Sequence, residues 1–318
     1  MTKEKRVSIK GSVSIGATVS CPDETRKYPA VVLIMGTGTT DRDGNEKRFK
    51  TDLYKKFADM FTGFGFVCVR YDKRGTFETE GDYNTAGLCD LIDDAISVIR
   101  YTKTLPYVDE TKIIVCGHSE GAMIATLLSA KEETAGLMLL GGAAVSMKDA
   151  LLYQNYLAAE EFANKKGLLG ALLKKQASRE KMDAKVEGMF KKCVSAKKDR
   201  VFFGGAVLNA KWVKEHASHS SDEYIELLKQ YGKPILAITG TADISTDYRQ
   251  LSALSEIPNA ECFTPQNVNH ILREIDDDNS VMTVKKQYAR LAAQPIHSDT
   301  KRCIKDWLRQ YNSKSDNL

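Results

Sequence analysis

Residues 113–121 read Ile-Ile-Val-Cys-Gly-His-Ser-Glu-Gly, and this stretch decides the fold. The apolar residues 113–116 predict a buried strand, and the helix formers at 122–128 predict a helix after it. Between them, Gly117 and Gly121 frame a turn so tight that only glycine leaves room beside Ser119. Glycine-x-serine-x-glycine in this setting is typical of an exposed nucleophile. We therefore predict that Ser119 is nucleophilic; the alternative is an ordinary turn with a spare serine.

Strands and helices alternate on both sides of this turn. The pattern predicts an antiparallel hairpin over 7–20, broken near Gly11. Further strands are expected at 30–35, 66–71, 136–140, 234–239 and 261–263. Helices are expected at 50–63, 86–104, 122–131, 246–256 and 299–311. Such alternation favours an α/β fold with a mostly parallel, doubly wound sheet.

The alternation stops after Ala144. Residues 147–217 contain no convincing buried strand and predict helices at 148–166, 171–192 and 208–216. Because strands resume at 234, this block is an insertion into one α/β domain. We expect a first part of the core at 1–146, a helical cap at 147–225 and a second part of the core at 226–318.

Composition limits the classes of function. A net charge of +4 over 318 residues gives no reason to expect a nucleic-acid partner. We see no signal peptide and no run long enough to span a membrane. The seven cysteines are scattered without a C-x-x-C pattern, which favours a reducing, cytoplasmic location over disulfides or a zinc site. The sequence leaves open whether the chain forms a homodimer.

A serine nucleophile needs a base, and the base needs an acid that orients it. His270 lies in a polar loop after the strand expected at 261–263, at the edge where parallel strands deliver functional side chains. Asp243 follows the strand at 234–239 and can orient that imidazole. We predict His270 as the base and Asp243 as the acid. Asp247 is the alternative acid, although a carboxylate there also suits the first turn of the next helix.

The other histidines have simpler interpretations. His118 is expected to point away from the nucleophile, and His297 to be structural because it precedes the last helix. His216 and His219 have a spacing that metal ligands use, but without a third ligand we expect them on a solvated surface. We predict no metal and no organic cofactor.

Two backbone N–H groups must bind the oxyanion that forms during acyl transfer. We predict that Glu120 supplies one, because it follows the nucleophile. Thr37 is the candidate for the other, since the glycines at 36 and 38 let the loop turn its N–H groups inward. A plain glycine-rich turn is the alternative. The spacing matches neither phosphate-binding glycine motif.

Together these motifs resemble the α/β-hydrolase superfamily, in particular bacterial esterases and serine-aminopeptidase-like hydrolases with a helical lid. The resemblance covers most of 25–312 outside the insertion. It rests on the stretches at 117–121, 35–38 with 41–44, 70–75, 240–243 and 269–270. It implies that 72–75 is a structural turn and that 41–43 flanks the oxyanion loop, with charges that pair locally or touch a substrate. One departure is Met35, where many members carry a histidine that hydrogen-bonds this loop.

The resemblance implies a serine hydrolase that cleaves small carboxylic esters through an acyl-enzyme. The alternatives are an aminopeptidase or an acyl thioesterase on the same scaffold, or a non-catalytic binding protein. In this family the insertion forms a lid. Over 160–200 it carries twelve basic and six acidic residues, which suits a solvated surface or an anionic substrate. Its apolar residues are candidates for the roof of the acyl pocket: Leu151, Leu152, Tyr153, Tyr156, Phe162, Leu168 and Leu169.

Overall fold

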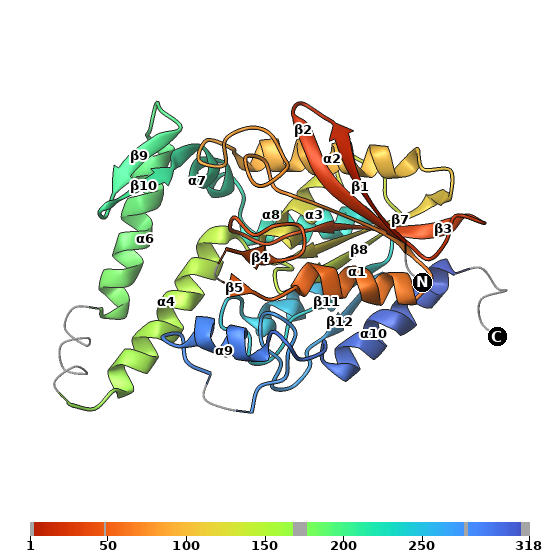
Figure 1. Cartoon of the computed structure of the whole chain (residues 1–318). Coiled ribbons are helices and arrows are strands. Elements are labelled where there is room, and N and C mark those ends of the chain that lie inside the picture. The colour runs from red at the N-terminus through yellow and green to blue at the C-terminus, as the bar shows by residue number, and fades with distance from the viewer. Residues whose placement is uncertain (1–2, 48, 168–176, 277–278, 313–318) are drawn as a thin grey trace.

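The computed structural model describes residues 3–47, 49–167, 177–276 and 279–312. An eight-stranded sheet in the order β1-β2-β6-β3-β7-β8-β11-β12 forms the centre of the molecule (Figure 1). Strands β1 and β2 form an antiparallel hairpin, β2 also runs antiparallel to β6, and the remaining neighbours are parallel. The strands are β1 (Lys3–Lys10), β2 (Ser14–Cys21), β3 (Tyr28–Ile34), β6 (Val67–Tyr71), β7 (Val108–His118), β8 (Gly136–Leu140), β11 (Ile235–Ile238) and β12 (Ala260–Phe263).

Helices cover both faces of this sheet, which explains its continuous apolar runs. In β3, Val32 packs into the core on one face while Val31 and Leu33 pack into the core on the other. Helices α2 (Leu88–Lys103), α3 (Glu120–Leu128) and α8 (Ser221–Tyr231) pack on the first face, with the 3-10 helix η1 (Tyr248–Leu254). Helices α1 (Leu53–Gly63), α9 (Val284–Leu291) and α10 (Ser298–Leu308), which continues into η2 (Arg309–Tyr311), pack on the second.

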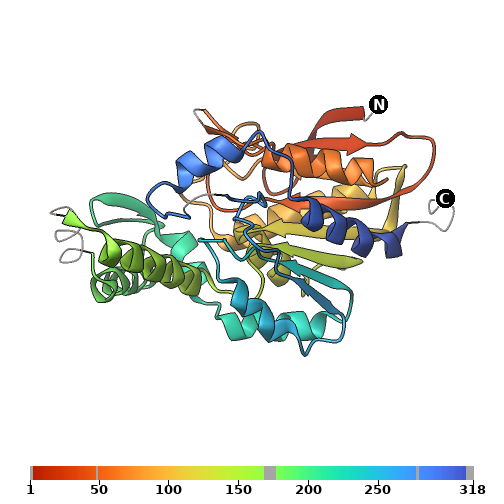
Figure 2. The same ribbon diagram turned by 90° about the horizontal axis from the view of Figure 1, so that it is seen from below.

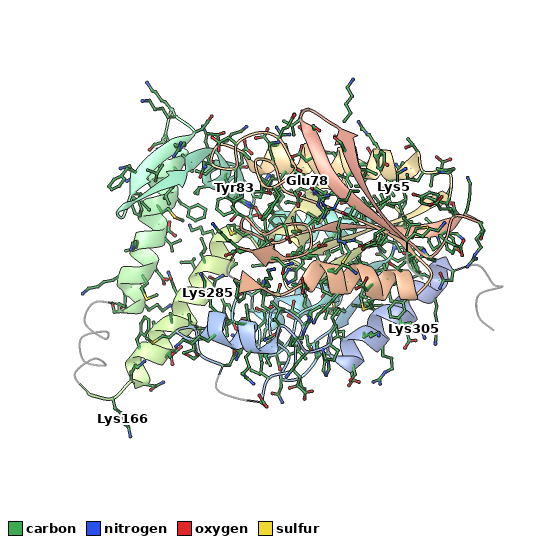
Figure 3. All side chains as sticks on the ribbon, viewed as in Figure 1. Lys5, Glu78, Tyr83, Lys166, Lys285 and Lys305 are labelled. Atoms are coloured by element: carbon green, nitrogen blue, oxygen red, sulfur yellow. The ribbon has the colours of Figure 1, made fainter. Side chains whose placement is uncertain are left out.

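The insertion stands apart from the sheet. It consists of α4 (Met147–Asn164), α6 (Arg179–Val194), the hairpin β9 (Arg200–Phe203) and β10 (Ala206–Asn209), and α7 (Ala210–Ala217). Both views show α4, α6 and the hairpin projecting to one side of the core, and Lys166 lies near the far tip (Figures 1, 2 and 3). A small cluster around the buried Phe190 and Cys193 holds these elements together.

The α/β class and the order of the core elements are confirmed, and the differences are local. The sequence did not reveal the hairpin at 200–209, because its strands are exposed or half-buried. Helices α8 and α9 were also missed, and the expected boundary at 225 falls inside α8, which packs against α3 of the core. A second small ribbon pairs β4 (Asn45–Glu46) with β5 (Phe49–Lys50), before α1 begins at Leu53. Part of the helix expected at 171–192 lies outside the described residues.

Candidate active site

Ser119 lies at the turn between β7 and α3 in a strained backbone conformation. Its φ of 57° and ψ of −123° are unfavourable for a residue with a side chain. The Ser119 N–H donates to the Leu140 carbonyl of β8 at 2.8 Å. A Cβ on Gly117 would lie 2.1 Å from the Gly121 carbonyl oxygen, and one on Gly121 would lie 2.1 Å from the Ile34 carbonyl oxygen. Close backbone approach therefore requires both glycines of the motif.

Asp243 and His270 come together from the loops after β11 and β12. The distance between His270 Nδ1 and Asp243 Oδ2 is 2.7 Å. The other carboxylate oxygen accepts the backbone N–H groups of Ser245 at 2.7 Å and Thr246 at 3.1 Å. Because an ionised carboxylate only accepts hydrogen bonds, Nδ1 carries the proton and Nε2 is left with its lone pair. The buried Asp243 thus sets the tautomer of the imidazole.

His270 and Ser119 border adjacent glycines after β8, His270 at Gly141 and Ser119 at Gly142. A Cβ on Gly141 would lie 3.0 Å from His270 Nδ1, and a Cβ on Gly142 would lie 2.3 Å from the Ser119 carbonyl oxygen. The hydrogen bonds of the described residues include none between the Ser119 hydroxyl and His270. Catalytic hydrogen bonds are often long in the absence of substrate and tighten when it binds.

The loop of Gly36 and Thr37 lies directly beside the nucleophile. A Cβ on Gly36 would lie 2.9 Å from the Ser119 Cβ, so only glycine fits there. Thr37 lines a cavity of about 100 Å³ together with Lys73, Tyr83, Ala86, Leu91, Asn209 and Trp212. Thr37 therefore follows the glycine that contacts Ser119 and forms part of the wall of this cavity.

The side chain of Glu120 is the centre of a buried charged cluster. One carboxylate oxygen accepts from Lys73 Nζ at 2.6 Å. The other accepts from Trp212 Nε1 at 2.6 Å and lies 3.1 Å from His216 Nε2. Burial raises the pKa of a carboxyl, but Lys73 and His216 outweigh it and lower the pKa of Glu120 below its ordinary 4.5. The cluster joins the nucleophile turn to α7 of the insertion.

This cluster corrects one sequence interpretation. His216 is fully buried against Glu120, so the expected solvated position is wrong for this histidine. His219 is partly exposed and lies 2.9 Å from a Glu223 carboxylate oxygen. Among the described residues, no group of three or more histidine, cysteine or acidic side chains could hold a metal ion.

The remaining candidates have structural contacts. Asp247 caps η1, where its Oδ1 accepts the Arg249 N–H at 3.0 Å, so it does not orient the base. His297 caps α10 by accepting the Thr300 N–H at 3.4 Å, in agreement with its structural interpretation. All seven cysteines are free.

The insertion also contacts the loop of the acid. Tyr153 of α4 donates to the Asp243 carbonyl oxygen at 3.3 Å, and it lines a cleft of about 430 Å³ with Leu157 and Glu161. Leu151 instead packs in the cluster around Phe190. Two other members of the expected roof, Leu168 and Leu169, lie outside the described residues.

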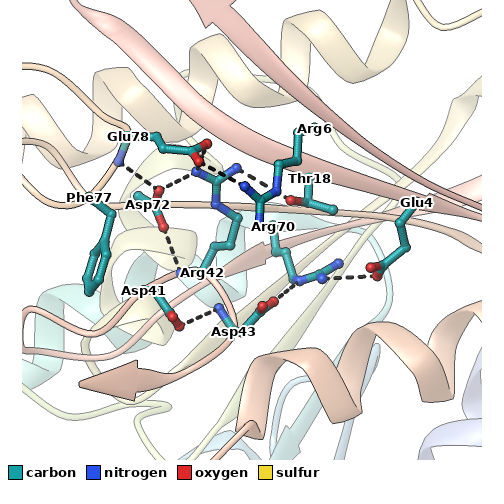
Figure 4. Close-up of a pocket in the computed structure, with 10 residues that line it drawn as sticks. All are labelled: Glu4, Arg6, Thr18, Asp41, Arg42, Asp43, Arg70, Asp72, Phe77 and Glu78. Carbon is teal, nitrogen blue, oxygen red and sulfur yellow. Dashed lines mark hydrogen bonds and ion pairs between the residues drawn. The ribbon is translucent and has the colours of Figure 1, made fainter. Parts of the chain in front are cut away.

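A charged cleft flanks β2 and β6 (Figure 4). Arg42 pairs with Asp72, and Arg70 donates to Asp43 at 2.7 Å. The charges at 41–43 therefore pair with neighbouring protein groups. In the following turn, Arg74 Nη2 donates to an Asp94 carboxylate oxygen at 2.6 Å.

The sequence analysis overlooked several residues that contact the candidate site. Tyr54 follows the apolar pattern of α1, and its hydroxyl accepts the Gly36 N–H at 2.8 Å and lies 3.1 Å from His118 Nδ1. Trp212 and His216 stand one helical turn apart on α7, a spacing that could have indicated a shared partner.

Among the described residues, no helix is long and apolar enough to cross a membrane.

Comparisons with known proteins place this geometry in a family. Residues 50–264 match the family model described as serine aminopeptidase, S33. Esterase EstD of Thermotoga maritima is 26% identical over 150 residues, which is 47% of this chain; the chain spans only 34% of that protein's length.

Solved structures show the same fold at low identity. Est1E of Butyrivibrio proteoclasticus with bound ferulic acid has a TM-score of 0.56 at 17% identity, over 91% of this chain and 99% of its own. The Pyrococcus furiosus esterase Pf2001 has a TM-score of 0.57 at 15% identity, over 98% and 94%. Since the family model covers more than half of its residues, the chain belongs to the serine aminopeptidase S33 family of the α/β-hydrolase superfamily.

Proposed function

We propose that the protein is a serine hydrolase that cleaves carboxylic esters with small acyl groups. The observation that carries the proposal is the buried Asp243–His270 pair, which adjoins Gly141 while the next residue, Gly142, adjoins Ser119. The names of the similar esterases support an ester substrate. Thioesters would react through the same groups and are an outcome of the substrate panel below.

The reaction follows from the groups in place. Ser119 Oγ attacks the acyl carbonyl carbon while His270 Nε2 takes its proton. The N–H groups of Thr37 and Glu120 bind the resulting oxyanion, and Asp243 stabilises the imidazolium. Collapse of the tetrahedral intermediate breaks the ester bond, and His270 returns the proton to the departing alkoxide. Water then attacks the acyl-enzyme by the same route and releases the acid.

We assign the acyl group of the substrate to the cavity that Thr37 lines, because Gly36 beside Thr37 contacts Ser119. The cavity volume of about 100 Å³ is smaller than the roughly 150 Å³ of a cavity that takes up benzene. We therefore expect the best substrates to carry acyl groups of about two to four carbons.

A fluorophosphonate probe and a panel of p-nitrophenyl esters and acyl thioesters test this function. We expect the probe to label the parent protein, and Ser119→Ala to lose both labelling and turnover. Ser129→Ala is the matched control, because that serine caps the far end of α3. Labelling that survives in Ser119→Ala would exclude Ser119 as the nucleophile, and no labelling of the parent would exclude the proposal.

One observation favours an aminopeptidase as the second candidate. Glu161 of α4 lines the cleft beside Asp243 and accepts from Ser280 Oγ at 2.5 Å and from the Val281 N–H at 2.8 Å. In the described part of the chain no cation pairs with it, so its charge is available for a substrate ammonium group. The carboxylate of Glu120 is instead neutralised by Lys73. Faster cleavage of aminoacyl p-nitroanilides than of esters, lost in Glu161→Gln, would establish this alternative.

A further inference from the structure

His118, the residue before the nucleophile, connects the three segments of the candidate site. Its Nε2 lies 2.8 Å from the backbone carbonyl oxygen of His270. Its Nδ1 lies 3.1 Å from the Tyr54 hydroxyl, which in turn accepts the Gly36 N–H at 2.8 Å. One buried side chain therefore touches the loop of the base directly and reaches the oxyanion loop through one hydroxyl.

The chemistry of the groups fixes the direction of each hydrogen bond that His118 and Tyr54 make. A carbonyl oxygen only accepts, so His118 Nε2 must carry a proton and donate it to His270. In the neutral ring Nδ1 then has a lone pair and accepts from the Tyr54 hydroxyl. The lone pairs of that hydroxyl are left to accept from Gly36. Burial and the adjacent His270 ring lower the pKa of His118 to about 3, which keeps the ring neutral.

The contacts of the His118 ring with two neighbouring rings fit a positioning role. The centroids of the His118 and His270 rings lie 4.8 Å apart, and those of His118 and Tyr54 lie 5.8 Å apart. Met35, which precedes Gly36 in the oxyanion loop, has no side-chain N–H or O–H that could hydrogen-bond this loop. In this chain the Tyr54 hydroxyl supplies a hydrogen bond to that loop.

We propose that His118 and Tyr54 are positioning residues that hold the oxyanion loop and the base loop in register with Ser119. Neither side chain transfers a proton to substrate. The inference rests on the proposed function, because it concerns how the groups of that reaction are held. A misplacement of about 1 Å in a catalytic group can cost roughly a hundredfold in rate, so severing either connection slows the chemical step.

Two variants of His118 separate its two connections. His118→Asn keeps an acceptor near the place of Nδ1 but has no donor that reaches the His270 carbonyl. His118→Gln keeps an N–H near the place of Nε2 but lacks the acceptor for the Tyr54 hydroxyl. Tyr54→Phe removes both hydrogen bonds of the hydroxyl, to His118 and from Gly36, and leaves the bond between His118 and the His270 carbonyl in place. The control is Tyr231→Phe, which removes a half-buried hydroxyl that bonds Thr134 before β8, at the opposite edge of the sheet.

We measure kcat and KM for a p-nitrophenyl ester, the rate of fluorophosphonate labelling and the melting temperature of every variant. We expect each of the three variants to lower kcat and the labelling rate about tenfold, with KM within twofold of the parent. Tyr54→Phe should add less than twofold in the His118→Gln background, where its connection is already cut, and about tenfold in the His118→Asn background. Tyr231→Phe should leave kcat unchanged.

The outcomes distinguish this inference from the proposed function. If Ser119→Ala is inactive while the Tyr54 and His118 variants keep the kcat of Tyr231→Phe, the positioning role is overturned and the proposed function stands. A raised KM with unchanged kcat and labelling rate would also overturn it. If Ser119→Ala retains activity and labelling, the proposed function fails, and the positioning role fails with it.

Discussion

Glu120→Gln removes the charge of this residue but keeps the shape of its side chain, so it tests the contribution of the ion pair between Glu120 and Lys73 beneath the nucleophile turn. In Glu120→Gln the amide oxygen can still accept from Trp212, but Lys73 remains 4% exposed without an anion. Among the described residues, Glu120 is the only carboxylate within ion-pair distance of Lys73. Breaking a buried pair on one side costs about 3–5 kcal/mol. Because Lys73 also lines the cavity beside Thr37, water can reach it there and we expect the lower end of this range.

This cost converts into a measurable melting temperature. An unfolding entropy of about 2.1 cal/mol/K per residue gives roughly 0.7 kcal/mol/K for this chain. A loss of about 3–5 kcal/mol then lowers the melting temperature by roughly 4–7 °C. Differential scanning calorimetry of Glu120→Gln, Lys73→Met and the double variant tests the reasoning. The melting temperature of the double variant should fall by much less than the sum of the decreases in the two single variants, because the double variant leaves no unpaired charge.

The exposed pair of Lys233 and Glu133, with Nζ 2.8 Å from the carboxylate, is the matched control. Its charge-removing variants should not shift the melting temperature measurably, because solvent screens the pair. Strictly additive losses for Lys73 and Glu120, or a shift of less than about 1 °C in Glu120→Gln, would refute the claim that this ion pair stabilises the fold.

Three further outcomes follow. Asp243→Asn should lower kcat about 10⁴-fold with little change in ester KM, because the imidazole loses its oriented tautomer; a loss below tenfold in steady-state assays would contradict the acid's role. Gly117→Ala should abolish soluble folded protein, because its Cβ would lie 2.1 Å from a Gly121 oxygen, whereas Gly63→Ala at an open helix position should raise the melting temperature slightly. Because folding lowers the pKa of Glu120, its ionised carboxylate stabilises the fold fully above the ordinary pKa of 4.5, and this stabilisation is lost as the pH falls below that value. Calorimetry from pH 6 to pH 3 should therefore show a smaller acid-induced decrease in melting temperature for Glu120→Gln than for the parent. Equal decreases would contradict this linkage.

The sequence was sufficient to predict the core because its signals are local. Buried parallel strands such as 30–35 need continuous apolar runs, and the turn around Ser119 needs glycine at both ends. The loops that carry Asp243 and His270 were predictable because parallel strands deliver their carboxyl ends to one edge. These rules depend only on neighbours along the chain or on the order of strands.

The contacts that brace the site were not predictable, because they join residues far apart in the chain. Tyr54 and His118 are separated by 64 positions, and nothing near either residue indicates the other. The sequence analysis did not predict the hairpin at 200–209 for a different reason. This hairpin forms outside the main core, where strands need no continuous apolar run. Helix α9 buries only Gln287 and Leu291, too few positions to produce a clear periodic pattern.

Glu120 shows that contacts elsewhere in the fold can restrict which amino acid occupies a variable position of a motif. The glycine-x-serine-x-glycine pattern leaves the residue after the nucleophile open, and the proposed reaction uses only its backbone N–H. In this chain the side chain at that position receives the donors of Lys73 and Trp212 and lies beside His216. An apolar residue there would leave these groups buried without a partner. The identity of residue 120 is therefore set by the turn after β6 and by α7, so the insertion and the nucleophile turn constrain each other's sequences.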